Sequence, residues 1–386
     1  MALCASGCLK TLDESLIDAT GGTGPSGGGA GAGGGGTGGV GGVSGAGGTT
    51  GGAGGAGGST GGGAGYQPYD PVKFPVQLLA TGTAPVMLGA DATDAYYAKA
   101  GAVDAPLYKV ALAGGTPATL PPLLEKPSGL AAPTNSTFLF VVGGRNTGAA
   151  ASLVRTAKAG SAKEEISIAG QSPLAARNIS VATDGFAYVT FDVDPTHGVA
   201  LARFGLSGGV SNATLLFDGA TSVAEAGGAV VASSACVYWI TGGAVWVMPS
   251  SGGVRASALQ SAVTDAIGLA ADAANFYITR GDGSVWSRPL SGAACDGAGG
   301  PEKKLAAGFA NIGPLIRFKS SSHIAWTARG DEAQGNAGGG VFMAPAGGGT
   351  VTQMAPGGGG PAALADAPTA VVFATGSGEL RSVKKP

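Results

Sequence analysis

From Tyr66 to the C-terminus, one two-part pattern of apolar and polar positions repeats along the chain. In the first part a short turn of Ala, Asp, Ser or Thr leads into aromatic and β-branched residues, as in "VATDGFAYVTF" from Val181. In the second part an apolar run, a Gly-rich turn and another run follow, as in "VWVMPSSGGVRASAL" from Val245. The two parts alternate without any 3.6-residue periodicity, so the pattern predicts strands and argues against a helical repeat.

The spacing of these units predicts the type of repeat. The centres of the first-part strands recur at intervals of about 40 to 50 residues, which is the period of a four-stranded β-propeller blade. These centres are Tyr97, Leu139, Tyr188, Tyr238, Tyr277, Trp326 and Phe373. We therefore expect an all-β fold, a β-propeller of seven four-stranded blades.

The last repeat lacks a fourth strand, because the sequence ends with the third strand of that repeat, "LRSVKKP". The segment "FPVQLLATG" at 74–82 is similar to the fourth strands "TVTQMAPGG" and "KKLAAG". We expect this N-terminal strand to close the last blade, because closure removes an exposed sheet edge. A six-bladed ring with one degenerate unit is the alternative.

One blade resembles a known propeller family. In "CVYWITGG", Tyr238 and Trp239 match the first two positions of the YWTD repeat, and Thr241 falls one place late. The repeat is thus similar to the YWTD propellers of lipoprotein-receptor ectodomains and to related repeats of bacterial cell-surface lipoproteins. The resemblance implies the fold, whereas function does not transfer, because propellers host many unrelated activities.

The chain before the repeats differs in composition. Residues 21–65 are Gly-rich without a charged or aromatic residue, which predicts a disordered, flexible tether. In residues 1–20, "ASGC" resembles the end of a bacterial lipoprotein signal, with Cys8 as the lipidated residue. The apolar run of about 7 to 15 residues that such a signal needs is missing. Either the sequence begins inside a longer signal, or the segment is cytoplasmic and the similarity is accidental.

These features predict three parts: 1–20 as a lipoprotein-like N-terminus, 21–65 as a linker and 66–386 as the propeller. We expect an exported monomer at the cell surface or in the periplasm of a bacterial envelope. No run of 18 apolar residues occurs, so only a lipid anchor would attach the chain to a membrane.

Two cysteines lie in neighbouring repeats. Cys236 begins a second strand, and Cys295 sits in the turn after the third strand of the next blade. Both turns belong to one face of a propeller, so we expect a Cys236–Cys295 disulfide, typical of an exported protein. Two buried thiols in a reducing compartment are the alternative.

Residue types limit the chemistry. With two histidines, His197 and His323, a multi-histidine metal or catalytic site cannot be built. A formal charge of −2 with 12% charged residues gives no basic surface for nucleic acid. We expect no catalytic residue, metal or cofactor, and we interpret "RGDG" at Arg280 as a tight hairpin turn.

Loop length predicts where a ligand would bind. The loops between second and third strands are long in the first, second, third and sixth repeats and short in the others. The polar residues expected to form a binding rim there are Asp104, Arg145, Asn146, Asp192, Asp194, His197, Arg329, Asp331 and Glu332. The predicted function is a non-catalytic, surface-anchored binding or scaffold module for a protein, glycan or wall component. A propeller lyase, lactonase or hydrolase acting at the central channel is the alternative.

Overall fold

Within the described residues, the repeated pattern of the sequence folds into 28 β-strands and no helix. The computed structural model describes residues 66–386 except 84, 100–103, 144–151, 161–163, 168–174, 183, 193–198, 207–212, 218–226, 234, 260–262, 291–294, 298, 332–337 and 358–359. Within this part of the chain, nothing forms a helix long and apolar enough to cross a membrane. Cys8 and the Gly-rich linker lie outside the described residues.

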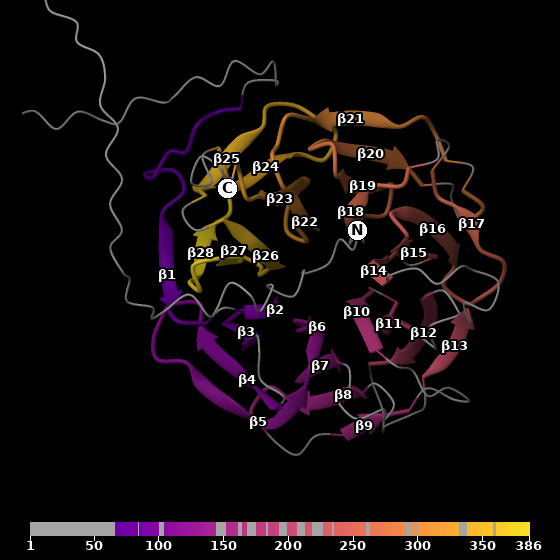
Figure 1. Cartoon of the computed structure of the whole chain (residues 1–386), viewed down its shortest axis with the longest axis horizontal. Coiled ribbons are helices and arrows are strands. Elements are labelled where there is room, and N and C mark those ends of the chain that lie inside the picture. The colour runs from indigo at the N-terminus through magenta and orange to yellow at the C-terminus, as the bar shows by residue number, and fades with distance from the viewer. Residues whose placement is uncertain are drawn as a thin grey trace, which may run out of the picture. The chain divides into compact units, whose positions relative to one another are not determined.

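The strands form seven antiparallel four-stranded sheets arranged as blades around a channel (Figure 1). Blades 1 to 3 consist of β2 (Pro85–Ala90), β3 (Asp94–Lys99), β4 (Asp104–Ala111), β5 (Ala118–Glu125); β6 (Pro127–Ala131), β7 (Phe138–Gly143), β8 (Ser152–Ala157), β9 (Glu164–Ile166); and β10 (Ala175–Val181), β11 (Phe186–Asp192), β12 (Val199–Gly205), β13 (Thr214–Phe217). Blades 4 and 5 consist of β14 (Gly227–Ala232), β15 (Cys236–Thr241), β16 (Ala244–Pro249), β17 (Ala256–Ser257); and β18 (Ala266–Ala271), β19 (Asn275–Arg280), β20 (Val285–Pro289), β21 (Lys303–Ala306). Blades 6 and 7 consist of β22 (Ile312–Arg317), β23 (His323–Ala328), β24 (Gly340–Pro345), β25 (Thr352–Pro356); and β26 (Pro361–Asp366), β27 (Ala370–Thr375), β28 (Leu380–Lys384), β1 (Val76–Ala80).

The ring closes through its N-terminal strand, as the sequence predicts. The strand order in blade 7 is β1-β28-β27-β26, with Val76 opposite Val383 and Gln77 opposite Ser382. Seven blades and the three-plus-one closure are therefore confirmed, and the six-bladed alternative is wrong.

The chain just before β1 extends this closure to blade 6. Gln67 adds a short parallel bridge to Thr352, its N–H donating to the Val351 carbonyl (2.8 Å) and its own carbonyl accepting from the Gln353 N–H (3.0 Å). The Tyr66 ring lies 5.1 Å from the Phe342 ring. An outer blade edge of this ring thus accepts an added segment of extended backbone.

The core lies between blades, because each sheet packs on a neighbour through both faces. The second strands supply most of the largest buried side chains, among them Trp239 and Trp326, both fully buried. Aromatic rings meet across blade boundaries, as in the stack of Tyr238 on Phe276 with centroids 5.1 Å apart. The aromatic centres of the sequence repeat are therefore the interblade core.

Every inner strand, the first strand of its blade, has a register shift near its start. In β18 the shift falls between Ala266 and Gly268, and in β22 between Ile312 and Leu315. Such a bulge leaves backbone groups outside the ladder. Thr279 meets two of them: its Oγ1 accepts from the Gly268 N–H (2.8 Å) and donates to the Gly313 carbonyl of the next blade (2.9 Å). A second-strand threonine therefore links two neighbouring bulges.

On the face of the ring opposite these bulges, acidic turns between first and second strands link neighbouring blades. Asp91 accepts hydrogen bonds from the Thr93 N–H (2.9 Å) and the Tyr96 hydroxyl (3.0 Å), and it pairs with Lys158 of blade 2 (2.8 Å). Burial raises the pKa of the Asp91 carboxyl, but the hydrogen bonds from Lys158, Thr93 and other donors outweigh it and lower that pKa to about 2. The Asp-Tyr turn recurs as Asp184 with Tyr188 (2.7 Å) and Asp272 with Tyr277 (2.7 Å).

The disulfide expected from the sequence is present between Cys236 and Cys295, with 5.6 Å between their Cα atoms. Arg288, almost fully buried, holds the loop that contains Cys295. Its guanidinium donates to the carbonyls of Gly297 (2.6 Å) and Gly300 (3.1 Å), and also to Ala258 of blade 4. Blades 4 and 5 are therefore linked covalently and by a buried cation.

Candidate functional site

One face of the ring, here called the loop face, contains the turns between second and third strands and the connections between blades. On blades 4, 5 and 7 these turns are short and bonded to the connections beside them. The Gly243 carbonyl accepts from the Ala266 N–H (3.0 Å), and the Gly283 carbonyl accepts from the Phe309 N–H (3.1 Å). A Cβ on Gly243 would lie 1.9 Å from the Thr264 carbonyl oxygen, so only glycine allows this approach. On this side of the loop face, backbone hydrogen bonds and close backbone contacts therefore join the turns to the interblade connections.

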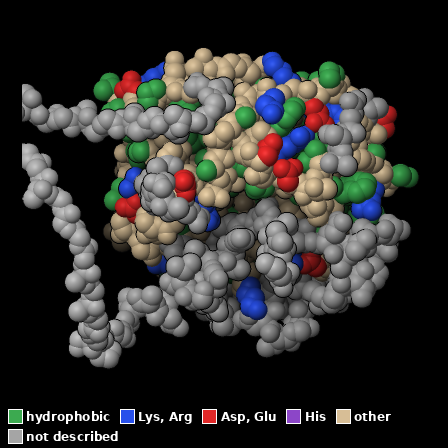
Figure 2. Space-filling model, turned by 45° about the horizontal axis from the view of Figure 1, so that its top comes forward, with side chains coloured by type: hydrophobic (Ala, Val, Ile, Leu, Met, Phe, Trp, Pro, Cys, Tyr) green, Lys and Arg blue, Asp and Glu red, His purple; other side chains and the backbone are tan. Residues whose placement is uncertain are grey.

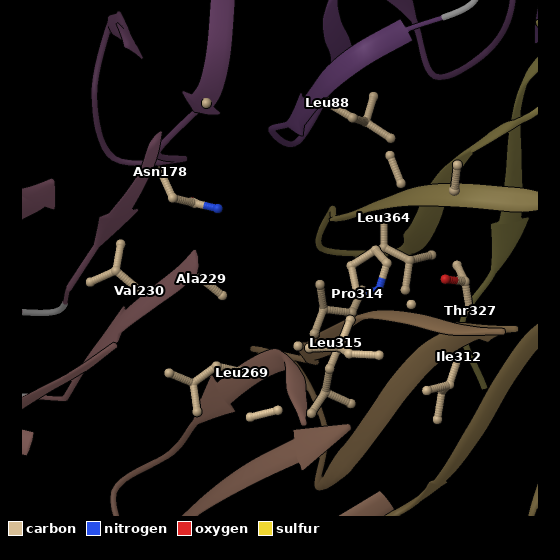
Figure 3. Close-up of a pocket in the computed structure, with 18 of the residues that line it drawn as sticks. Leu88, Asn178, Ala229, Val230, Leu269, Ile312, Pro314, Leu315, Thr327 and Leu364 are labelled. Carbon is tan, nitrogen blue, oxygen red and sulfur yellow. The ribbon is translucent and has the colours of Figure 1, made fainter. Parts of the chain in front are cut away.

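A cavity of about 660 Å³ occupies the channel and opens beside these turns. All seven inner strands line it. Figure 3 shows part of this lining. One aliphatic residue per blade recurs at equivalent ladder positions: Leu88, Leu130, Ile179, Val230, Leu269, Leu315 and Leu364. The volume of the cavity falls within the range of about 300–1,000 Å³ that is usual for ligand pockets.

Polar groups reach the cavity at a few points. Figure 3 shows the Asn178 amide and the Thr327 hydroxyl directed into it from opposite sides. The Asn178 Oδ1 accepts from the Ile179 N–H (2.8 Å). Thr327 is fully buried, and its Oγ1 has no hydrogen-bond partner among the described residues. This hydroxyl is therefore a buried polar group directed at the cavity.

The ionisable groups that border the cavity, within the described ranges, lie at the loop face. Asp265, in the connection before β18, accepts from the Asp282 N–H (3.3 Å). Arg329, directly after β23, donates its backbone N–H to the Asn311 carbonyl (3.1 Å). The mouth is thus polar and carries charges of both signs, whereas the described lining below it is neutral.

The described members of the predicted rim do not all lie at the cavity. Arg329 borders it, and Asp331 is exposed nearby in the loop of blade 6. Asp192 ends β11 in an ion pair with Arg177 (2.7 Å). Asp104 begins β4, and its side chain is not among those described. The remaining rim residues, Arg145, Asn146, Asp194, His197 and Glu332, lie outside the described residues. A binding role for the rim stays a prediction.

Apart from Arg329, the polar residues that line the cavity were not predicted from the sequence. Asp265 and Asn311 lie in connections between blades, and Asn178 and Thr327 lie within strands. A search for long, polar second-to-third loops passes over all four. Their common signal is position: each lies beside an inner-strand register shift or an interblade connection.

The described residues offer little for catalysis or metal binding. They contain no group of three or more His, Cys, Asp and Glu side chains that could hold a metal ion. His323 lies at the start of β23, away from the cavity, with its Nδ1 3.2 Å from the Ser321 hydroxyl; burial and the charge of Arg317 lower its pKa. Arg280 of the "RGDG" turn pairs with Glu302 (2.7 Å) and is not displayed for adhesion.

Figure 2 shows described charges of both signs intermixed on the face in view, with no broad patch of one sign.

Comparison with known proteins supports the fold alone. No protein-family model matches the sequence, and no curated protein matches it either. Among solved structures, virginiamycin B lyase from Staphylococcus aureus is similar with a TM-score of 0.59 at 12% identity, covering 81% of this chain and 100% of the lyase. YCF48 bound to D1 peptide gives 0.58 at 12% identity (83% and 100% covered), and the WD40 propeller domain of Doa1 gives 0.54 at 10% identity (81% and 98%). The chain is therefore a seven-bladed β-propeller whose structural relatives include both enzymes and binding domains.

Proposed function

We propose that this protein is a non-catalytic binding module that recognises a protein partner through its loop face. The observation that supports this most is the cavity at that face, built by all seven blades and bordered by Asp265 and Arg329. It is a preorganised concave surface, which lowers the entropic cost of binding. Its described lining holds no histidine and one carboxylate, which is too little for an acid-base pair.

The structural relatives are compatible with this role. One was solved with a bound peptide and another is a WD40 domain, while a third is a lyase. An enzyme acting in the channel is the alternative function. Turnover would need additional groups from the loop residues outside the described part of the chain.

We further propose that the ring is held at a bacterial cell envelope by a lipid on Cys8 and the Gly-rich tether. The Cys236–Cys295 disulfide supports an oxidising compartment, because disulfides rarely persist in the cytosol. Growth with an alkyne-labelled fatty acid should label the full chain and leave a Cys8→Ser variant unlabelled. Equal labelling of both would refute the anchor.

The binding proposal can be tested with the full chain by crosslinking in cells that express it. Arg329→Ala and Asp331→Ala, both on the loop face, should lower the amount of one specific partner protein that is crosslinked to the chain. Lys319→Ala, exposed on the opposite face in the turn between β22 and β23, is the control and should leave that partner unchanged. If Lys319→Ala removes the partner and the loop-face changes do not, the proposal is wrong. Recovery of a glycan or wall component in place of a protein would show that the ligand class proposed here is wrong.

A further inference from the structure

The inner strands present unpaired edges to the channel. Each of them is the terminal strand of its sheet, so the edge on the channel side has no neighbouring strand. A strand edge offers backbone N–H and C=O groups that can pair with another extended chain. The cavity therefore combines edge groups with the aliphatic side chains of the same strands.

The same ring already binds extended backbone at another edge. Gln67 pairs in parallel with β25 through the two backbone hydrogen bonds described above. That contact shows how a blade of this protein accepts an added peptide: backbone bonds supply the pairing, and an aromatic contact of Tyr66 supplies apolar packing.

The side chains of the cavity discriminate between ligand classes. No aromatic residue is among the described residues that line it, so this described lining offers no ring on which sugars or bases could stack. No described ionisable group lies below the mouth, so a charged group inside would leave water without an ionic partner, which is unfavourable. The ligand class that fits this lining is therefore a neutral one, with small apolar side chains and its own hydrogen-bonding backbone.

Thr327 supplies the independent pointer to a ligand. Thr190 and Thr279, on equivalent strands, donate to the bulge carbonyls of Gly228 (3.3 Å) and Gly313 (2.9 Å) in the next blade. Thr327 lies at the same ladder position of blade 6, yet its buried hydroxyl has no described partner. A hydroxyl left in this state is costly unless a bound group or water satisfies it.

We propose that the cavity binds an extended, uncharged peptide segment with small aliphatic side chains, which hydrogen-bonds to Thr327 and to inner-strand backbone between β22 and β26. This inference rests on the proposed function and specifies its ligand. The segment would be a terminus or loop of the partner protein that enters the channel while the partner's surface meets the loop face.

The test is affinity selection by the full chain from defined peptide mixtures, read out by mass spectrometry. One mixture is randomised over Gly, Ala, Val and Leu, a second over Ser, Asn and Gln, and a third over Asp and Lys, all with blocked ends. We expect enrichment from the first mixture only. Thr327→Val should weaken the Kd of the enriched peptides by about 3- to 10-fold, the loss of one hydrogen bond.

Two cavity variants and two matched controls make the test specific. Ala229→Leu fills the cavity from β14 and should abolish selection, whereas Ala118→Leu and Thr119→Val, exposed on β5, should leave it unchanged. Thermal melting of each variant verifies that it is folded. Should Ala229→Leu unfold the ring, Thr327→Val alone decides.

The outcomes separate this inference from the broader proposal. Equal enrichment from all mixtures, or enrichment unaffected by Thr327→Val and Ala229→Leu, overturns the peptide site. If partner crosslinking still depends on Arg329 and Asp331 in that case, loop-face binding stands without the channel. If none of these substitutions changes either the peptide enrichment or the amount of crosslinked partner, both proposals fail.

Discussion

Thr279→Val should weaken the ring markedly, because this one hydroxyl serves two neighbouring bulges. Thr279 is fully buried on β19, accepts from the Gly268 N–H at 2.8 Å and donates to the Gly313 carbonyl at 2.9 Å. Valine keeps the shape and removes both hydrogen bonds. The Gly268 N–H cannot turn to the β-ladder, since it lies at the register shift.

The magnitude follows from what is left behind. A typical internal hydrogen bond contributes about 0.5 to 1.5 kcal/mol, and a buried donor without a partner costs about 1 to 3 kcal/mol. Losing the bond to Gly313 and orphaning the Gly268 N–H should together lower the free energy of unfolding by about 2 to 4 kcal/mol. Thr327→Val removes a hydroxyl with no described partner, so its effect should be near zero or slightly stabilising.

The assay is urea unfolding of the full chain, followed by tryptophan fluorescence under oxidising conditions. The midpoint should fall for Thr279→Val and hold for Thr327→Val, at an unchanged slope, because the slope reports surface exposed on unfolding. Equal destabilisation by the two substitutions would refute the argument that hydroxyl bonding to the bulges, rather than packing, is the cause.

Three further perturbations test other parts of the ring. Asp91 has its pKa lowered to about 2, so its contribution of about 2 kcal/mol should be present above pH 4 and disappear as the pH falls toward 2; Asp91→Asn should flatten that part of a urea-midpoint profile. Replacing Cys236 and Cys295 by alanine should lower the free energy of unfolding by about 2 to 4 kcal/mol in chemical denaturation, since the disulfide closes a loop with a sequence separation of 59. Alkylation of both Cys236 and Cys295 in the denatured, non-reduced protein, located by peptide mass spectrometry, would contradict the bond. Gly283→Ala would place a Cβ 2.1 Å from the Phe309 carbonyl oxygen, whereas a Cβ at Gly338 meets nothing within 4 Å, and both glycines have a similar positive φ. Gly338→Ala should therefore cost only the backbone strain of about 1 kcal/mol, and Gly283→Ala should lower the melting temperature clearly further.

The architecture was accessible from the sequence because it is local and repeated. Apolar runs every 40 to 50 residues or so, with turns between them, are enough to predict blades. The closing strand could be found because "FPVQLLATG" is similar to the fourth strands of other repeats, and β1 occupies Val76–Ala80 within it. The disulfide followed from the same logic, since the start of a second strand and the turn after a third strand lie on the same face.

The cavity was not accessible because it depends on register. The inner strands contain bulges, and a bulge changes which residues face the channel without leaving a mark in the apolar-polar pattern. Thr279 and Thr327 illustrate this limit: "ITR" and "WTA" are similar in sequence, yet one hydroxyl bonds to the next blade and the other has no described partner. Part of the difference lies in the inner strand, because Gly268 offers an N–H to Thr279 whereas the matching residue before Leu315 is Pro314, which has none. The carbonyl partner in the next blade depends on how adjacent blades are placed.

The two sides of the loop face differ in a way that bears on affinity. Around Gly243 and Gly283, backbone hydrogen bonds join turns to interblade connections, and the Cys236–Cys295 bond and Arg288 hold blades 4 and 5 together beneath them. A ligand that contacts this side meets groups already ordered by folding, so ordering them on binding costs little. Asp265, at the cavity mouth, belongs to this preorganised side. Loosening it, for example by removing the disulfide, should therefore weaken ligand binding through the geometry of the mouth even though neither cysteine borders the cavity.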